Sequence, residues 1–228
     1  ITTSAAIWVP GKVPLCTVAV GSTAATLAAV TLANVLSGVV SGTPPSARSE
    51  HSAVSWIDPS TNALKMTVFG GIESVHTPVT KKNDVHTLDL VTGVWSGVIA
   101  TSGTPPSARQ ASATVGWIDP TTNSPKMTVF GGQDGSKKND VHTLDLATGV
   151  WSGAVTTSGT PPSARSHHST VGWIDPTTNS PKMTVFGGID GLGFGGNKND
   201  VHTLDLTTGT WSGAVATSGT PPSARYQH

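Results

Sequence analysis

This sequence contains little cysteine and few charged residues. A single cysteine, Cys16, cannot form an internal disulfide and cannot build a zinc cluster alone. Charged residues make up 11% of the chain, and its 13 basic and 13 acidic side chains give a net charge of zero. Because nucleic-acid affinity comes largely from clustered lysine and arginine, this balance argues against a nucleic-acid partner.

Long apolar runs are also missing. No charge falls between Lys12 and Arg48, but Pro14, Gly21 and many serine, threonine and alanine residues interrupt this stretch. A membrane helix needs about 20 consecutive, predominantly apolar residues, so we expect no membrane span. No signal peptide is visible after Ile1. The low charge and the many small polar residues favour a secreted protein, with the cytoplasm as the alternative.

Repetition is the dominant feature that the sequence does have. The run KMTVFGG occurs three times, at residues 65–71, 126–132 and 182–188. Each copy is followed by NDVHTLDL, a Thr-Gly pair, a tryptophan and then SGTPPSAR. An apolar run that is rich in β-branched and aromatic residues and ends in two glycines is typical of a β-strand. A unit that recurs in this order predicts a repeat architecture.

The units differ in length at one place. The arginine that ends PPSAR recurs at intervals of 61, 56 and 60 residues, and 11, 6 and 10 residues separate the glycine pair from Asn-Asp. Residues 1–47 align with the same pattern as a degenerate unit, with Ala19 in place of the phenylalanine and Leu36 in place of the tryptophan. We therefore expect a single domain, 1–228, with units at about 1–47, 48–108, 109–164 and 165–224 and the start of a fifth at 225–228.

Each unit predicts four strands. The first follows the arginine, at about 50–57, 111–118 and 167–174, the second is the KMTVF run, the third is DVHTLDL, and the fourth starts at the tryptophan. A four-stranded antiparallel sheet cannot bury both faces alone, so neighbouring units must pack together. This predicts an all-β fold, a β-propeller of four-stranded antiparallel blades. Propellers contain roughly four to eight blades, so the four units form a small ring or part of a larger one.

The unit resembles the kelch repeat over nearly the whole chain. The matching parts are Arg-Ser-x-His-Ser at 165–169, VFGG, Asn-Asp-Val, Asp-Leu-x-Thr-Gly and the tryptophan. The resemblance implies one unit per blade, with the first strand along the central channel and the tryptophan strand outermost. It also implies a partner-binding surface on the face that carries the variable connections.

A partner-binding face is predicted where variable connections meet SGTPPSAR, because alternate connections of a meander emerge on one side and variable loops usually carry recognition. The repeated arginines could bind a carboxylate or phosphate with two parallel hydrogen bonds. Their recurrence in every unit favours a structural role. The better candidates for specific partner contacts are therefore the loops 72–82, 133–138 and 189–198. The predicted contact residues are Arg48, Arg109, Arg165, Arg225, Lys81, Lys82, Gln133, Lys137, Lys138, Asp190, Leu192, Phe194 and Lys198.

Two sets of repeated side chains could suggest a metal site, but we expect none. His86, His142 and His202 occupy one position in successive units, too far apart to share a zinc ion at about 2.0–2.1 Å, so we expect packing histidines. Asp134 and Asp190 lie near other aspartates and could bind calcium, but turn capping is the simpler interpretation.

Two motifs resemble cofactor sites, but each lacks a part that the site requires. Residues 191–196 match G-x-G-x-x-G by letter, but a strand follows where a dinucleotide site needs a helix. A copper site with a crosslinked cysteine and tyrosine, as in kelch-type oxidases, uses a second tyrosine, and Tyr226 is the only one here. We expect no cofactor.

The residues contain no recognisable set of nucleophile, base and acid, so we expect a non-catalytic module or scaffold that binds a protein partner. Two alternatives remain open. One is a structural subunit of an extracellular or multi-protein assembly, in which the chain associates with itself or with another subunit. The other is a glycan-binding or enzymatic propeller.

Overall fold

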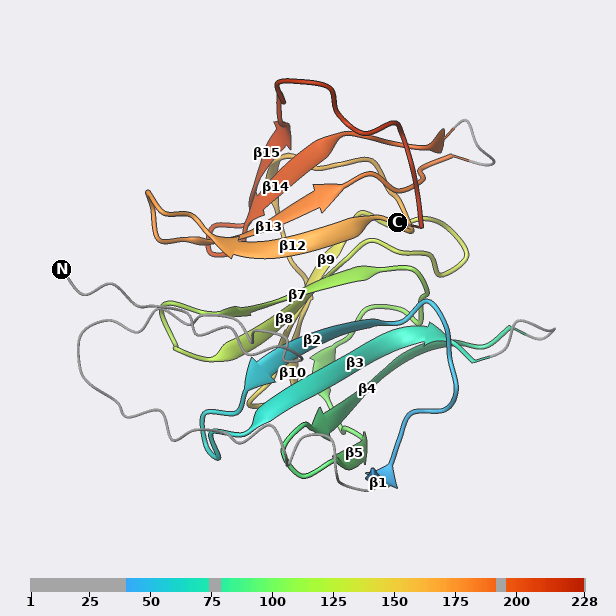
Figure 1. Cartoon of the computed structure of the whole chain (residues 1–228), viewed down its shortest axis with the longest axis vertical. Coiled ribbons are helices and arrows are strands. Elements are labelled where there is room, and N and C mark those ends of the chain that lie inside the picture. Colours follow the sequence, from blue (N-terminus) through green and yellow to red (C-terminus); the bar gives the residue numbers. More distant parts are fainter. Residues whose placement is uncertain (1–39, 74–78, 192–195, 228) are drawn as a thin grey trace, which may run out of the picture. The chain divides into compact units, whose positions relative to one another are not determined.

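The computed structural model describes residues 40–73, 79–191 and 196–227, and it confirms the all-β fold. The described strands form three sheets of five strands each, which we call blades I, II and III (Figure 1). Blade I contains β1 (Ser41–Thr43), β2 (Ser52–Ile57), β3 (Leu64–Ile72), β4 (Lys81–Asp89) and β5 (Val94–Val98). Blade II contains β6 (Ser102–Thr104), β7 (Ala113–Ile118), β8 (Pro125–Phe130), β9 (Val141–Asp145) and β10 (Val150–Ala154). Blade III contains β11 (Ser158–Thr160), β12 (Ser169–Ile174), β13 (Pro181–Phe186), β14 (Val201–Asp205) and β15 (Thr210–Ala214).

Four strands of each blade form the predicted antiparallel meander. In blade III, β12 pairs with β13, β13 with β14 and β14 with β15, and the other two blades repeat this order. The first strands β2, β7 and β12 contact one another in sequence, as expected for the strands along a channel. The tight turn between the last two strands uses the Thr-Gly pair, whose glycine has a positive φ, as at Gly149 (φ 72°).

The tryptophan strand is not the outermost one, contrary to the expectation from the kelch resemblance. The SGT segment of the preceding connection adds a short fifth strand, so that β1 pairs in parallel with β5, β6 with β10 and β11 with β15. The pairing is close enough to require glycine: a Cβ on Gly103, at φ 76°, would lie 2.2 Å from the carbonyl oxygen of Trp151. The repeat units predicted from the sequence begin at the arginine. Their boundaries therefore assign the outer strand to the unit before the blade that it completes.

The first strand of each blade begins two residues later than predicted. Glu50, Ala111 and His167 adopt the left-handed conformation, with φ between 51° and 57°, and cannot be part of an extended strand. Their backbones connect successive blades, because the amide of Ala111 donates to the carbonyl of Glu50 and the amide of His167 donates to the carbonyl of Ala111.

The hydrophobic core lies between the blades. The first cluster contains Val54, Phe69 and Val85 of blade I with Met127, Val129, Leu144 and Trp151 of blade II. The second contains Val115, Phe130 and Val141 of blade II with Met183, Val185, Leu204 and Trp211 of blade III. Each blade thus has a forward face, with the phenylalanine and the valines of its first and third meander strands, and a backward face, with the methionine and valine of the second strand, the leucine of the third and the tryptophan of the fourth.

The variable connections leave the blades on one side, to the right in Figure 1, and the turns at 58–63, 119–124 and 175–180 lie on the opposite side. Residues 1–39, which include Cys16 and most of the predicted degenerate unit 1–47, lie outside the described residues. Within the described ranges, no helix is long and apolar enough to cross a membrane.

Candidate functional site

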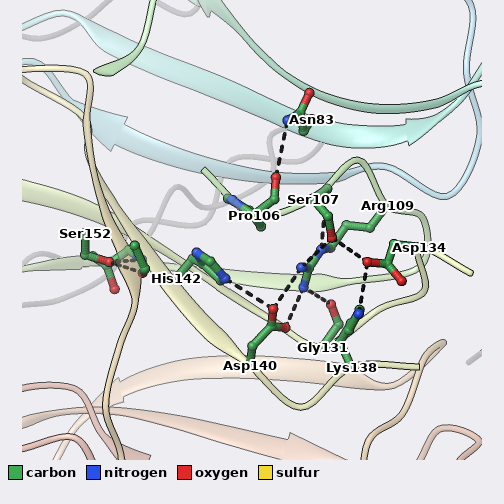
Figure 2. A network of polar contacts seen from close by, with 12 residues as sticks. Asn83, Pro106, Ser107, Arg109, Gly131, Asp134, Lys138, Asp140, His142 and Ser152 are labelled. Carbon is green, nitrogen blue, oxygen red and sulfur yellow. Dashed lines mark hydrogen bonds and ion pairs between the residues drawn. The ribbon is translucent and has the colours of Figure 1, made fainter. Parts of the chain in front are cut away.

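The predicted face is organised around the repeated arginine. Arg109, which is 1% exposed, donates to both carboxylate oxygens of Asp140, at 2.6 and 2.9 Å, and to the carbonyl of Gly131 at 2.9 Å (Figure 2). It also donates to the hydroxyl and the carbonyl oxygen of Ser107 in its own connection. The guanidinium therefore joins the start of the blade to the glycine pair and to the Asn-Asp motif of the same blade.

The same contacts recur in blades I and III. Arg165 is fully buried and donates to Asp200 and to the carbonyl of Gly187, and Arg48 donates to Asp84 and to the carbonyl of Gly70. Arg109 and Arg165 are therefore inaccessible to a partner, and their geometry matches the structural role that recurrence favours. Arg225 differs from the others: it is exposed, and among the described residues its side chain donates to Ser223.

The repeated histidines lie beside the same aspartates. The Nε2 atoms of His86, His142 and His202 are 3.1–3.2 Å from the carboxylates of the residues two positions earlier, and all three rings are buried. Each aspartate therefore lies between an arginine and a histidine of its own blade. Asp140 faces Arg109 rather than Asp134, so the two carboxylates do not converge as a calcium site would require.

An ion pair closes the base of each variable loop. Lys82 binds Glu73 at 2.8 Å, Lys138 binds Asp134 at 3.0 Å and Lys198 binds Asp190 at 2.8 Å. The acidic residue also accepts a hydrogen bond from the serine of PPSAR, as from Ser107 to Asp134 in Figure 2. Asp134 further accepts from the amide of Ser136, which is the predicted turn capping.

The loops of neighbouring blades also touch. Lys81 of blade I reaches the backbone carbonyl of Asp134 at 3.5 Å, and Lys137 of blade II donates to the carbonyl of Gly191. Asn83 of blade I donates to the carbonyl of Pro106 at 3.3 Å, as Figure 2 shows. The loops and the SGTPPSAR connections thus form one continuous rim, which we call the loop rim.

Three of the predicted contact residues remain to be placed. Gln133 pairs through its backbone with Gln110, in the connection of its own blade, and its side chain is half-buried. Leu192 and Phe194 lie outside the described residues. Sequence reasoning missed the aspartates of the Asn-Asp motif as partners of the arginines, and it missed the lysine that pairs with each loop carboxylate. The available signal was the joint recurrence of Lys-Asn-Asp and of an acidic residue after each glycine pair.

The arginine contacts change the acidity of the aspartates. Burial alone would raise the pKa of Asp140, but the hydrogen bonds from Arg109 and His142 outweigh burial and hold that pKa well below its ordinary value. The same competition, with Arg165 and His202 as the hydrogen-bonding partners, lowers the pKa of Asp200 to about 2. These carboxylates are therefore ionised in the folded protein throughout the neutral and mildly acidic range.

Stability is expected to fall as the pH drops from about 4 towards 2. An aspartate with a depressed pKa stabilises the fold fully above its unfolded value, near 3.9, and loses that contribution as the pH falls through its folded value. We expect a loss of about 1 kcal/mol per carboxylate, allowing for partial exposure. Urea unfolding at several pH values measures the loss, and Asp200→Asn should show a shallower dependence than the unaltered chain. An identical dependence in the variant would contradict this.

The described geometry is that of stacked propeller blades with a shared loop rim. Similarity to known sequences identifies the family. The model of the KLHDC2/KLHL20/DRC7 Kelch-repeats domain matches residues 31–175 and 120–228. The chain therefore belongs to the kelch-repeat family.

Three relatives show the range of the likeness. The chain is 34% identical over 191 residues to the Rab9 effector protein with kelch motifs of Bos taurus, covering 82% of this chain and 46% of that protein. It is 35% identical over 158 residues to host cell factor 2 of Homo sapiens, covering 65% and 18% respectively. It is 32% identical over 130 residues to kelch domain-containing protein 1 of Mus musculus, covering 57% and 29%. The chain thus spans less than half the length of these relatives.

Proposed function

We propose that this protein is a non-catalytic interaction module that binds a protein partner through the tips of its variable loops. The observation that carries the proposal is the division of the loop rim into a constant base and variable tips. The base is constant because the arginine–aspartate contact and the lysine–carboxylate pair recur in all three blades. In blades I, II and III, the difference in length between the arginine and the aspartate falls within the segments between the two members of each lysine–carboxylate pair, and these segments also differ in sequence.

This division favours the tips over the arginines as the contact surface. Arg48, Arg109 and Arg165 are occupied inside the blades, so they hold the rim in shape and leave recognition to tip residues such as Lys81 and Lys137. Rigid bases also lower the entropy that a loop loses on binding, which increases affinity. The name of the bovine relative, a Rab9 effector, supports a protein as the kind of partner.

A loop exchange tests the proposal. Residues 72–82 of blade I are replaced by the shorter loop 133–138 of blade II, which keeps the glycine pair, the acidic residue and the paired lysine. Affinity capture from cells that produce the protein is then compared for the unaltered and exchanged chains. We expect the specifically captured proteins to be lost, with the circular dichroism spectrum unchanged.

The matched control exchanges two turns on the opposite side of the blades. Residues 58–63 are replaced by residues 119–124, which have the same length and the same Asp-Pro start. This variant should capture the same proteins as the unaltered chain. If both exchanges leave capture unchanged, the loop tip of blade I is not a contact surface.

A further inference from the structure

A cavity of about 460 Å³ lies between blades I and II, on the side of the turns. Most of its wall comes from blade I, including Trp56 and Asp58 near the turn 58–63, Lys65 of β3 and Asp89 at the end of β4. Blade II contributes the turn that follows β9, beginning with Leu146. The cavity is therefore a feature of the contact between two neighbouring blades.

The other two blades show what the aspartate at the end of the third meander strand binds. In blade II, Oδ2 of Asp145 accepts two hydrogen bonds, from the ammonium of Lys126 at 2.7 Å and from the hydroxyl of Ser124 at 2.8 Å. In blade III the same two kinds of donor contact the equivalent oxygen, from Lys182 and Ser180 to Asp205.

Blade I departs from this pattern at Asp89. Ala63 stands where blades II and III have the serine, so the hydroxyl donor is absent. The ammonium of Lys65 lies 2.7 Å from Asp58 of the turn and 5.7 Å from the centre of the Trp56 ring. Its counterparts in blades II and III are 3.8–4.0 Å from the turn aspartate and bind the strand aspartate instead. Among the described residues, Asp89 therefore has neither the lysine nor the serine of its counterparts.

Asp89 nevertheless carries a charge. Its Oδ1 accepts hydrogen bonds from the amides of Val91 and Thr92, at 3.0 and 2.8 Å. Burial raises the pKa of Asp89, but the hydrogen bonds from Thr92 and Val91 outweigh burial and keep that pKa below its ordinary value. An ionised carboxylate has capacity for about four hydrogen bonds, and it binds a cationic donor more strongly than a neutral one.

The cavity beside this carboxylate also has apolar walls. Trp56 is half-buried, and Ile99 and Leu146 are partly buried against the core cluster between blades I and II. Walls of this kind accommodate the hydrocarbon stem of a side chain or ligand whose charged end binds a polar group. The combination favours a cation at the end of an alkyl chain over a compact, strongly hydrated ion.

We propose that this cavity binds a primary ammonium group carried on a short alkyl chain. The ammonium donates to Asp89, as the lysine ammonium does to the equivalent oxygen in blades II and III, and the stem packs against Trp56, Ile99 and Leu146. Either a free alkylamine or the lysine side chain of a partner has this chemistry. The cavity lies on the side opposite the loop rim, so the inference does not depend on the proposed function.

A titration followed by nuclear magnetic resonance tests the proposal on the full chain. The probe is n-pentylamine at neutral pH, and the readout is the indole N–H signal of Trp56, identified by its loss in Trp56→Phe. We expect a saturable shift of this signal with n-pentylamine and none with the uncharged n-pentanol. Nα-acetyl-lysine amide distinguishes the two sources: a comparable shift assigns the cavity to a lysine side chain, and a shift with n-pentylamine alone assigns it to a free amine.

Three variants test the role of the carboxylate. Asp89→Asn should weaken binding of n-pentylamine by about tenfold, because it removes the charge but keeps an oxygen for the two amides. Ala63→Ser should also weaken binding, because it returns the serine donor of the other blades. Asp205→Asn is the matched control and should bind like the unaltered chain, because it makes the same change in blade III. The absence of a saturable shift in the unaltered chain would overturn the proposal, and so would equal affinity in Asp89→Asn.

Discussion

Replacing Arg109 by alanine is expected to lower the free energy of unfolding by about 3 kcal/mol, because removing one partner of a buried ion pair leaves the other uncompensated. Asp140 would lose the two hydrogen bonds from Arg109 that help to hold its pKa down, and the carbonyl of Gly131 would lose its buried donor. The loss should be visible as an earlier urea unfolding transition followed by circular dichroism.

The fourth copy of the motif supplies the control for this experiment. Arg225→Ala removes an arginine that also ends a copy of SGTPPSAR, but this side chain is exposed and, among the described residues, donates only within its own connection. We expect a change within about 0.5 kcal/mol when both variants are measured under the same conditions. Equal losses for the two variants would show that the buried contacts of Arg109 do not stabilise the blade.

The arginine–aspartate contact also shows where sequence reasoning reached its limit. The recurrence of the arginine was enough to favour a structural role, but its partner could not be named. The two residues lie 36, 31 and 35 residues apart in blades I, II and III, because the variable loop falls between them. A contact without constant spacing has no signature in a single sequence, even when both residues recur.

The outer strand of each blade was missed for a related reason. Ser-Gly-Thr is too short and too rich in glycine to resemble a strand, and its partner is the tryptophan strand that follows some fifty residues later, as for Ser41 and Val94. The antiparallel meander was predictable because its strands are neighbours in sequence and are separated by recognisable turns. The predictable part of this fold is therefore its local part, and the connections between blades require the structure.

The left-handed residues at the start of each blade show the same difference between local structure and contacts between blades. Glu50, Ala111 and His167 share a conformation but no side-chain chemistry, and none of them is glycine or asparagine. Their conformation comes from the hydrogen bonds between successive blades, which outweigh the local preference for an extended strand. A prediction from residue type extends the strand through them, as it did here.

Replacing Trp151 by alanine is expected to lower the free energy of unfolding by about 3–5 kcal/mol, because the substitution opens a large cavity in the core between blades I and II. Trp151 is 2% exposed, and its ring packs edge-on against Phe69, with centroids 5.5 Å apart. Within the part of the chain that the structure describes, its indole nitrogen has no hydrogen-bond partner. Trp151→Phe should therefore be milder, because it keeps much of the packing and removes the buried donor.

Trp173→Ala is the matched control for the loss of a tryptophan. Trp173, in blade III, is 41% exposed among the described residues, so we expect a cost of about 1 kcal/mol, although its nitrogen donates to Thr184. Urea unfolding of the three variants measures the difference. If Trp151→Ala cost no more than Trp173→Ala, packing between blades would not be the main source of stability. Stability would then have to come mainly from contacts within single blades. Against this, each core cluster contains residues of two neighbouring blades.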